Sequence, residues 1–132
     1  MDTEAVERML RESGCALTPQ RRAILRFLDG NQAHPTAGDI LDAVTRDFPI
    51  TSRATVYNTL ALLVDVGAVR AVRTEHGDVR YDPNTDPHHH LACTRCGGLE
   101  DVPAGEVTIL RGGRAVTGQV RFDGLCGRCS AR

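Results

Sequence analysis

Lysine is absent from this chain of 132 residues, and all sixteen of its basic residues are arginine. Also absent is any apolar run close to the roughly 18 residues that a membrane-spanning helix requires. The first ten residues, MDTEAVERML, contain no basic region leading into an apolar run, which a secretory signal would contain. We therefore expect a cytoplasmic protein with no membrane partner.

The chain has neither a Ser/His/Asp pattern nor a His-Glu-x-x-His helix, so no motif supports a hydrolase. We expect a protein that is not an enzyme. The net charge of −1 neither indicates nor excludes a nucleic-acid partner, although arginine suits bidentate phosphate contacts. The first 82 residues carry ten arginines and twelve acidic residues, so any DNA-binding surface there must be a local cluster.

Four stretches before residue 68 have apolar residues at the spacing of an amphipathic helix. Residues that favour helix N-caps precede three of them, and Thr36 with Asp39 three residues later resembles a capping box. Glycines at positions 14, 30 and 67 mark helix ends. The sequence therefore predicts helices over residues 2–12, 18–29, 36–48 and 51–66.

The stretch AVRAVRTEHGDVRYD predicts two strands joined by a turn at His76-Gly77-Asp78. Helices followed by an arginine-bearing hairpin are typical of a winged helix, whose last helix enters the major groove of DNA. The composition fits equally well a small helical domain whose surface residues are merely solvated. On the DNA-binding interpretation, the side chains expected to contact base edges or phosphates are Arg53, Thr55, Tyr57, Asn58, Arg70, Arg73 and Arg80.

Four of the five cysteines form two Cys-x-x-Cys pairs, Cys93 with Cys96 and Cys126 with Cys129. In a cytoplasmic protein such pairs favour metal or redox chemistry over disulfides. Four thiolates prefer tetrahedral Zn²⁺, so the sequence predicts a structural zinc site that ties the second pair to the strand before the first. Two unrelated reduced pairs or a redox couple are the alternatives. We interpret Cys15 as a small apolar residue.

Three consecutive histidines, His88 to His90, precede the first cysteine pair. If residues 88–93 form a strand, His88 and His90 project to one face while His89 and Cys93 project to the other. His88 and His90 then belong to a second metal site, and two histidines with carboxylates suit Fe, Mn or Ni. The alternative is a solvated histidine run. Carboxylates near enough in sequence to complete the site are Asp82, Asp86, Glu100 and Asp101.

Five segments and the final Cys-x-x-Cys pair, in this order, resemble the ferric uptake regulator (Fur) family, and within it the peroxide-sensing repressors. The segments are LTPQRRAIL, AHPTAGDI, ATVYNTL, GDVRYD and HHHLACTRCGGLED. The resemblance implies an α+β fold, with a winged helix-turn-helix DNA-binding domain at residues 1–82. A small α/β dimerisation and metal-binding domain, with the four-cysteine zinc site, is implied at residues 83–132. It also implies a homodimer on palindromic operator DNA, with a regulatory metal between the two domains.

Carried over by motif, the resemblance implies five ligands for a regulatory Fe²⁺ or Mn²⁺: His34, Asp82, His88, His90 and Asp101. Asp101 and Asn58 are similar to the peroxide sensors, whereas iron sensors of the family typically carry glutamate and arginine at these two positions. The resemblance thus implies a repressor that senses peroxide through metal-catalysed oxidation of a ligand histidine. The alternative is a sensor of iron, manganese, nickel or zinc availability.

The chain departs from the family pattern in two places. Ala16 stands where the resemblance leads us to expect a basic residue that reaches the minor groove. The segment between Cys96 and Cys126 is short and lacks the histidine-bearing strand expected before the final cysteines, so we expect a thinner dimerisation sheet. Several glycines within residues 102–118 predict that any helix there is brief.

Overall fold

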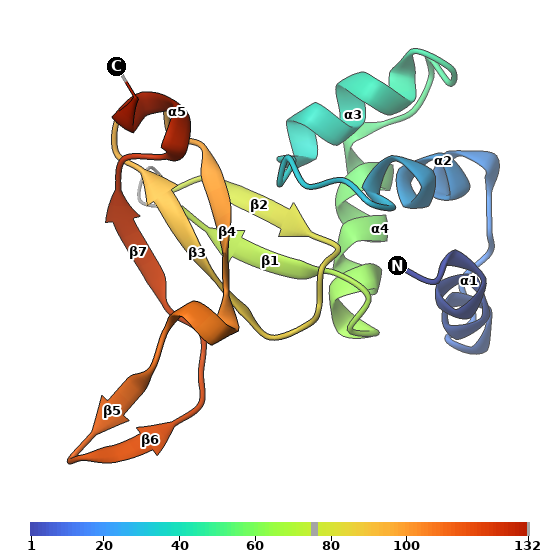
Figure 1. Cartoon of the computed structure of the whole chain (residues 1–132). Helices are drawn as coiled ribbons and strands as arrows, with labels where there is room; N and C mark the ends of the chain where they lie inside the picture. The colour runs from blue at the N-terminus through green and yellow to red at the C-terminus, as the bar shows by residue number, and fades with distance from the viewer. Residues whose placement is uncertain (75–76, 132) are drawn as a thin grey trace. The chain divides into compact units, whose positions relative to one another are not determined.

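The computed structural model describes residues 1–74 and 77–131. The chain divides into two compact units (Figure 1). The first comprises Met1–Arg73 and Gly77–Thr85, and the second consists mainly of Asp86–Arg132. The predicted helices and the hairpin lie in the first unit, whereas the histidine run and the paired cysteines lie in the second.

Each helix of the first unit begins at a residue that caps it. Asp2, Thr18, Thr36 and Ser52 each accept a hydrogen bond from the backbone N–H three residues later. Thr36 and Asp39 form the predicted capping box. The four predicted helices are confirmed, although the third ends at Thr45, earlier than expected. They are α1 (Thr3–Glu12), α2 (Pro19–Leu28), α3 (Ala37–Thr45) and α4 (Arg53–Asp65).

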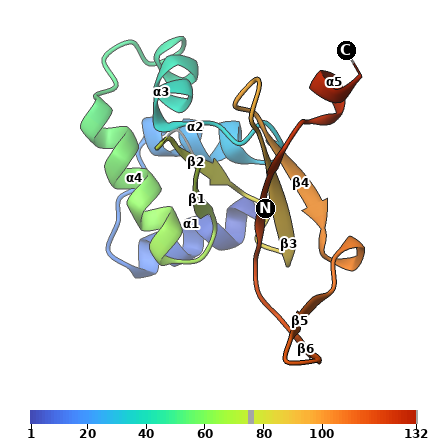
Figure 2. The same cartoon turned by 90° about the vertical axis from the view of Figure 1, so that its left-hand side faces the viewer.

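One apolar core holds these helices together. α4 packs against each of the other three helices (Figure 2). The residues that fill this core recur at helical spacing, because that spacing places them on one face of each helix. The largest of the buried side chains are Leu10 of α1, Ile24, Leu25 and Leu28 of α2, Ile40 of α3, and Leu60 and Leu63 of α4.

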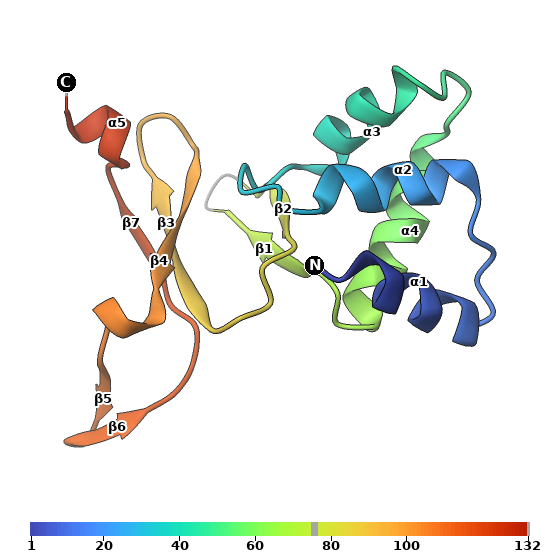
Figure 3. The same cartoon turned by 45° about the vertical axis from the view of Figure 1, so that its right-hand side comes forward.

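The predicted hairpin is present: β1 (Arg70–Arg73) pairs antiparallel with β2 (Val79–Asp82) (Figure 3). Gly77 has a positive φ of 84° in the connection, a conformation that glycine adopts without strain. His76 of the predicted turn lies outside the described residues. The register sets Arg70 opposite Asp82, and alternation then divides the hairpin arginines between two faces. Arg73 shares a face with Tyr81, whereas Arg70 and Arg80 lie on the other face.

The second unit is built on a three-stranded sheet in the order β4-β3-β7 (Figure 1). The central strand β3 (His88–Cys93) is antiparallel to β4 (Leu99–Pro103) and parallel to β7 (Arg121–Gly124). The short helix α5 (Gly127–Ser130) comes directly after β7. Because β3 and β7 are parallel, their carboxyl ends meet at one edge of the sheet. This pairing brings the first cysteine pair beside the second.

The expected brief helix within residues 102–118 is a single 3-10 turn, η1 (Ala104–Glu106). The sequence pattern did not predict the rest of this segment, in which β5 (Ile109–Arg111) and β6 (Arg114–Val116) form a hairpin that extends away from the sheet (Figure 1). Its two-residue turn consists of Gly112 and Gly113, with φ of 59° and 75°. Two consecutive residues with positive φ are typical of a type I′ hairpin turn, which explains why this segment is not helical.

The predicted α+β class is confirmed, with helices concentrated in the first unit and strands in the second. Within the part of the chain that the structure describes, no helix is both long and apolar enough to cross a membrane.

Candidate metal centres

The first candidate centre is formed by the paired cysteines of the second unit. Cys93 ends β3, Cys96 lies in the turn to β4, Cys126 caps α5 and Cys129 lies within it. The four sulfurs all lie within 4.8 Å of one another, and the Sγ atoms of Cys96 and Cys126 are 3.8 Å apart. In a tetrahedral site with Zn–S bonds of about 2.3 Å, the sulfurs lie ~3.8 Å apart. The cluster therefore fits one zinc ion.

Backbone N–H groups point at three of these sulfurs. The N–H groups of Cys96, Gly98 and Cys129 donate to the sulfurs of Cys93, Cys96 and Cys126 respectively, each at 3.4 Å. The N–H of Cys96 is the main reason that the pKa of Cys93 falls to about 5, and the N–H of Gly98 likewise lowers the pKa of Cys96. These donors prepare the sulfurs to bind a cation as thiolates.

Cys129 behaves in the opposite way. Its hydrogen bond with the Cys126 side chain raises the pKa of Cys129 to about 12, so this thiol keeps its proton when no ion is bound. A zinc ion bound by all four sulfurs must displace that proton. Zinc affinity is therefore expected to fall as the pH falls.

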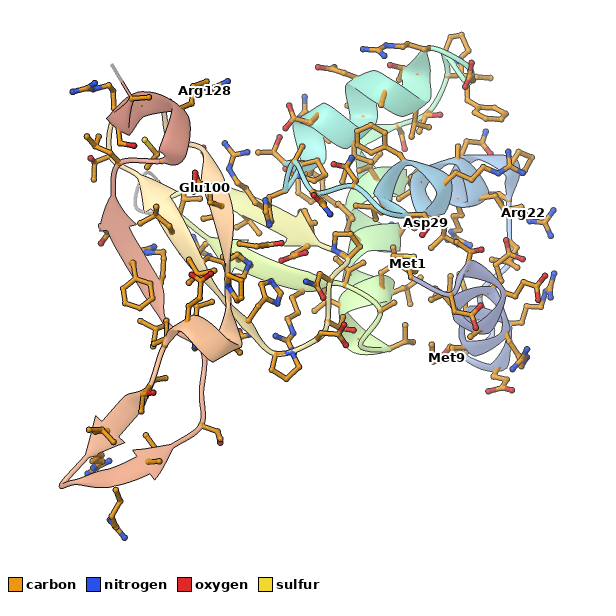
Figure 4. The ribbon with its side chains drawn as sticks, viewed as in Figure 1. Met1, Met9, Arg22, Asp29, Glu100 and Arg128 are labelled. Carbon is orange, nitrogen blue, oxygen red and sulfur yellow. The ribbon has the colours of Figure 1, made fainter. Side chains whose placement is uncertain are left out.

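Residues around the cluster hold α5 in place. Gly127 donates its N–H to the Oε2 of Glu100 at 2.8 Å, and Arg95 donates to the carbonyl of Cys129 at 3.3 Å. Arg128 lies on α5, and a hydrogen bond to Cys96 raises the pKa of its guanidinium. Figure 4 labels Glu100 on β4 and Arg128 on α5. A four-thiolate zinc site has excess negative charge, which Arg128 partly offsets.

The second candidate centre uses the histidine run. His88 and His90 lie on the same face of β3, as the predicted alternation requires, and both side chains are buried. Their Nε2 atoms are 3.1 Å apart, and the Oδ1 of Asp101 lies 3.4 Å and 3.5 Å from them. Donors bonded to one ion at about 2.1 Å, with angles between 90° and 109°, lie ~3.0 to 3.4 Å apart. The three donors therefore have the spacing that a single ion requires.

A backbone hydrogen bond of His88 also suits metal binding. Its Nδ1 lies 2.6 Å from the carbonyl oxygen of Asp86 and donates to it, which in the neutral imidazole leaves the lone pair on Nε2. Metal-binding histidines are commonly oriented by a hydrogen bond of this kind. Asp86 thus acts through its backbone carbonyl.

The strand register selects one carboxylate from the sequence candidates in the second unit. β3 and β4 pair so that His90 is opposite Asp101 and Leu91 is opposite Glu100. Opposed residues share a face, so Asp101 projects with the histidines. Glu100 projects to the other face, where it binds the N–H of Gly127.

The first unit contains the donor pair His34 and Asp82. The Nε2 of His34 lies 3.5 Å from the Oδ2 of Asp82, and both side chains are buried. The Oδ1 of Asp82 accepts the N–H of Asn84 at 2.9 Å, which orients the carboxylate. His34 precedes α3 and Asp82 ends β2, so tertiary structure brings the two residues together.

The backbone of His34 is left-handed, with a φ of 53°. Among the non-glycine residues in the described ranges, only His34 has a positive φ. This conformation costs free energy and persists only where neighbouring structure holds it. β2 holds it here: Arg80 donates to the carbonyl of His34 at 3.1 Å, and the N–H of Tyr81 donates to the carbonyl of Pro35 at 2.9 Å. Arg80 therefore supports the His34 segment.

The predicted DNA-contacting residues of α4 lie near its N-terminus. Arg53, Tyr57 and Asn58 are exposed, and Tyr57 retains 48% of its surface. The Thr55 hydroxyl is less available to a partner, because its oxygen lies 2.9 Å from the hydroxyl oxygen of Ser52 within the helix cap. α4 therefore offers a compact group of polar side chains to a partner.

The hairpin arginines differ in their surroundings. Arg73 is exposed, whereas Arg70 donates to the carbonyl of Thr85 at 2.8 Å and Arg80 donates to His34. The sequence pattern did not distinguish the exposed arginine from the two that donate to carbonyls, because the register of the hairpin decides on which face each residue lies. Phosphate contact by the three hairpin arginines stays a prediction, and the structure adds a backbone carbonyl partner for Arg70 and for Arg80.

His89, which the sequence pattern left without a role, is a structural residue. Its side chain is buried, its Nδ1 accepts the N–H of Val120 at 2.9 Å, and its ring contacts Phe122 edge-on. This contact attaches the segment before β7 to the central strand. Cys15 packs against the apolar core of the first unit, as expected of a small apolar residue.

Comparison with known proteins identifies the family. The model of the ferric uptake regulator family matches residues 12–117. The chain belongs to the ferric uptake regulator family. The peroxide-responsive repressor PerR of Staphylococcus aureus, a curated relative, is 44% identical over 92 residues, which are 70% of this chain and 62% of the relative. The match thus leaves more than a third of that relative's length uncovered.

Solved structures of family members have the same fold. The ferric uptake regulator of Helicobacter pylori, described as having three functional metal-binding sites, superposes with a TM-score of 0.80 at 18% identity, covering 97% of this chain and 91% of that one. The peroxide-sensing PerR of Streptococcus pyogenes superposes with a TM-score of 0.57 at 31% identity, covering 96% and 91%. The family's fold therefore extends over nearly all of this chain.

Proposed function

We propose that this chain is a metal-dependent transcriptional repressor that binds palindromic operator DNA as a homodimer and responds to peroxide. The observation that carries the proposal is the His88, His90 and Asp101 donor set, whose spacing suits one divalent ion. Membership of a regulator family supports the repressor role. The 44% identity to a peroxide-responsive repressor supports the peroxide response. These functions locate the protein in the cytoplasm and do not require an enzyme.

Two kinds of metal would serve this repressor. The four cysteines would hold a structural Zn²⁺, which has no redox chemistry and would stabilise the second unit. Fe²⁺ or Mn²⁺ would be the regulatory ion, with His34, Asp82, His88, His90 and Asp101 as its ligands. The geometry within each donor set supports this assignment, and borderline divalent metals are suited to mixed imidazole and carboxylate ligands.

DNA recognition is assigned to α4 and the hairpin. Arg53, Tyr57 and Asn58 would reach base edges in the major groove, with Thr55 at the edge of this group. Arg73 would contact a phosphate. Arg70 and Arg80, which bind backbone carbonyls, would act mainly by stabilising the domain. In the homodimer, two copies of α4 would read half-sites about 34 to 36 Å apart.

The alternative function is a sensor of iron, manganese, nickel or zinc availability on the same fold. It is favoured by the donor chemistry, since imidazole and carboxylate ligands accept several divalent metals and affinity alone does not select among them. Operator binding by air-free protein, measured with each metal and then after peroxide, separates the two functions.

The first test replaces His34 with alanine. Loss of this ligand is expected to abolish the stimulation of operator binding by Mn²⁺ while one zinc per chain is retained. Gel shifts with and without Mn²⁺, together with zinc analysis, measure both quantities.

Arg53→Ala is the comparison variant. It should weaken operator binding about 5- to 100-fold, with or without Mn²⁺, because the proposed partner of Arg53 is a base. Unchanged Mn²⁺ stimulation in His34→Ala would remove this histidine from the site.

A second test addresses the support of His34 by Arg80. Alanine at position 80 removes the hydrogen bond to the His34 carbonyl, and Mn²⁺ affinity is expected to fall about tenfold, the lower end of effects seen for residues that orient ligands. Calorimetric titration of the zinc-loaded protein with Mn²⁺ gives the affinity. Arg46→Ala, which removes an exposed arginine beyond α3, is the matched control and should bind Mn²⁺ normally. Equal affinities in the two variants would contradict the supporting role.

A further inference from the structure

The first unit has an apolar groove between α2 and the end of α3, two helices that pack against each other. Its volume is about 300 Å³. Small side chains keep it open, because Ala23 of α2 and Ala43 of α3 line it where longer side chains would fill the space. Phe27 and Phe48 also line the groove and are only partly buried, so apolar surface is accessible from it. The groove contains none of the proposed metal ligands or DNA-contacting residues.

Opposite charges stand on the two walls of the groove. Arg26 lines it from α2, and Asp47, which follows α3, lines it from the other side. Both side chains are exposed, and neither makes an ion pair within the part of the chain that the structure describes. The groove therefore offers one positive wall and one negative wall to a partner.

A turn presents an exposed isoleucine beside the groove. The carbonyl of Phe48 accepts hydrogen bonds from the N–H of Thr51 at 3.0 Å and from the Thr51 hydroxyl at 2.7 Å. Pro49, whose ring fixes its φ, lies within this turn. Ile50 follows with 93% of its surface exposed, the largest fraction among the exposed large apolar side chains of the described residues. Exposed turn positions usually carry Gly, Asn, Asp or Ser, so an isoleucine here favours a contact outside the chain.

We propose that this groove is a contact surface between two copies of the chain, which belong to neighbouring repressor dimers on the operator DNA. The inference deepens the proposed function and rests on its DNA binding. A two-fold axis through the groove exchanges its two walls, so Arg26 of each copy would face Asp47 of the other. The opposite charges thus make the groove complementary to itself, whereas walls of like charge would repel a second copy.

The same axis accounts for Ile50. Because Ile50 lies on the α3 side of the groove, the rotation places it against the α2 wall of the other copy, where Ala23 leaves room and Phe27 offers an apolar surface. Burying an isoleucine there removes apolar surface from water on both copies. One contact would bury two isoleucines and form two ion pairs, since each copy contributes the same groups.

The size of the surface limits where the contact forms. Seven residues line the groove, whereas a stable interface uses roughly 20 to 30 residues on each partner. Free dimers would therefore associate only weakly through it. Two dimers on neighbouring operators are held close together by the DNA, which raises the effective concentration of one groove for the other. The expected consequence is cooperative operator binding.

Cooperativity is measured with metal-loaded protein, as the ratio of its affinities for DNA with two operators and DNA with one. The unmodified protein should bind the second operator at least about tenfold more tightly than a single operator, the effect of burying one isoleucine side chain. A series of spacers should give a maximum that recurs about every 10 to 10.5 bp, because the two grooves must lie on the same side of the duplex. Lack of cooperativity at every spacing over one turn would overturn the proposal.

Ile50→Ser is the first variant. The side chain is exposed and serine is common in turns, so the melting temperature and the affinity for a single operator should not change. Cooperativity should fall to about threefold or less, because the main apolar contribution is lost. Val64→Ser is the matched control, since Val64 is an exposed apolar residue of α4 that does not line the groove. It should keep full cooperativity.

Charge reversal tests the exchange of walls. Arg26→Asp gives a groove with two negative walls and Asp47→Arg gives one with two positive walls, so each variant alone should lose cooperativity about threefold to tenfold. An equal mixture of the two variants should regain it, because each negative groove can then face a positive one. A role of either residue within its own chain predicts no recovery in the mixture.

The outcomes separate this inference from the proposed function. Cooperativity that Ile50→Ser retains, or that the mixture fails to recover, would overturn the groove contact, while binding to a single operator would still support the proposed function. Metal-loaded protein that binds no operator would overturn the proposed function. Light scattering of concentrated protein without DNA then tests the groove alone: association should weaken in Ile50→Ser and in each charge variant, and equal scattering by all of them would overturn the contact.

Discussion

Serine in place of Cys96 is expected to abolish zinc binding and to unfold the second unit. Zinc held by four thiolates contributes roughly 10 to 16 kcal/mol to the folding of small domains, far more than a three-stranded sheet of this size gains from packing. Cys96 is the informative choice because it is the exposed member of the cluster, so serine there costs little packing. Loss of stability in this variant therefore reports the lost metal ligand.

Zinc analysis and thermal unfolding by circular dichroism measure the effect of Cys96→Ser. Cys15→Ser is the matched control, because Cys15 is also a free cysteine but lies against the helical core of the first unit. It should keep one zinc per chain and nearly the same melting temperature. A Cys96→Ser protein that kept its zinc and its melting temperature would show that the four sulfurs do not share an ion.

The helices of the first unit were predictable because their signals are local. Caps such as Thr18 and Ser52 and apolar residues at helical spacing lie within one or two turns of the helix that they determine. The faces of β3 were predictable for the same reason, since alternation in a strand depends only on the strand itself. Both the helices and the shared face of His88 and His90 were therefore found from the pattern alone.

The remaining features depend on pairings between distant segments. Whether Asp101 or Glu100 lies beside His88 and His90 depends on the β3–β4 register, which local sequence signals do not determine. The parallel pairing of β7 with β3 joins segments about thirty residues apart, and the division of Arg73 from Arg80 again depends on register. The β5–β6 hairpin was not predicted although its signal is local: Gly112-Gly113 interrupts a helix, but two adjacent glycines also favour a hairpin turn.

The largest functional effect is expected when the Fe²⁺ and Mn²⁺ forms meet peroxide. The Fe²⁺ form should lose operator binding at low peroxide, whereas the Mn²⁺ form should keep it, because Mn²⁺ gives up an electron far less readily. The net reaction inserts one peroxide oxygen into a C–H bond of a ligand imidazole and releases the other oxygen as water. His34 and His88 are the expected targets, and Zn²⁺, which is not redox-active, should stay bound.

The histidine run provides an internal control for this chemistry. His89 lies between two proposed ligands but projects to the other face, where its Nδ1 binds the N–H of Val120. Cleavage after arginine yields one peptide, residues 81–95, that contains all three histidines of the run, and another, residues 27–46, that contains His34. Fragment-ion mass spectrometry should find a gain of about 16 Da on His34 or His88 and none on His89.

Asp101→Glu tests whether sensing depends on ligand geometry as well as on the metal. The longer side chain would still offer a carboxylate oxygen near the Nε2 atoms of His88 and His90, but it would change the arrangement of the three donors. Metal-dependent operator binding should persist while oxidation of the Fe²⁺ form slows at least several-fold. Equal peroxide resistance of the Fe²⁺ and Mn²⁺ forms of the unmodified protein would instead identify a sensor of metal availability, because the bound metal would then control DNA binding without reacting.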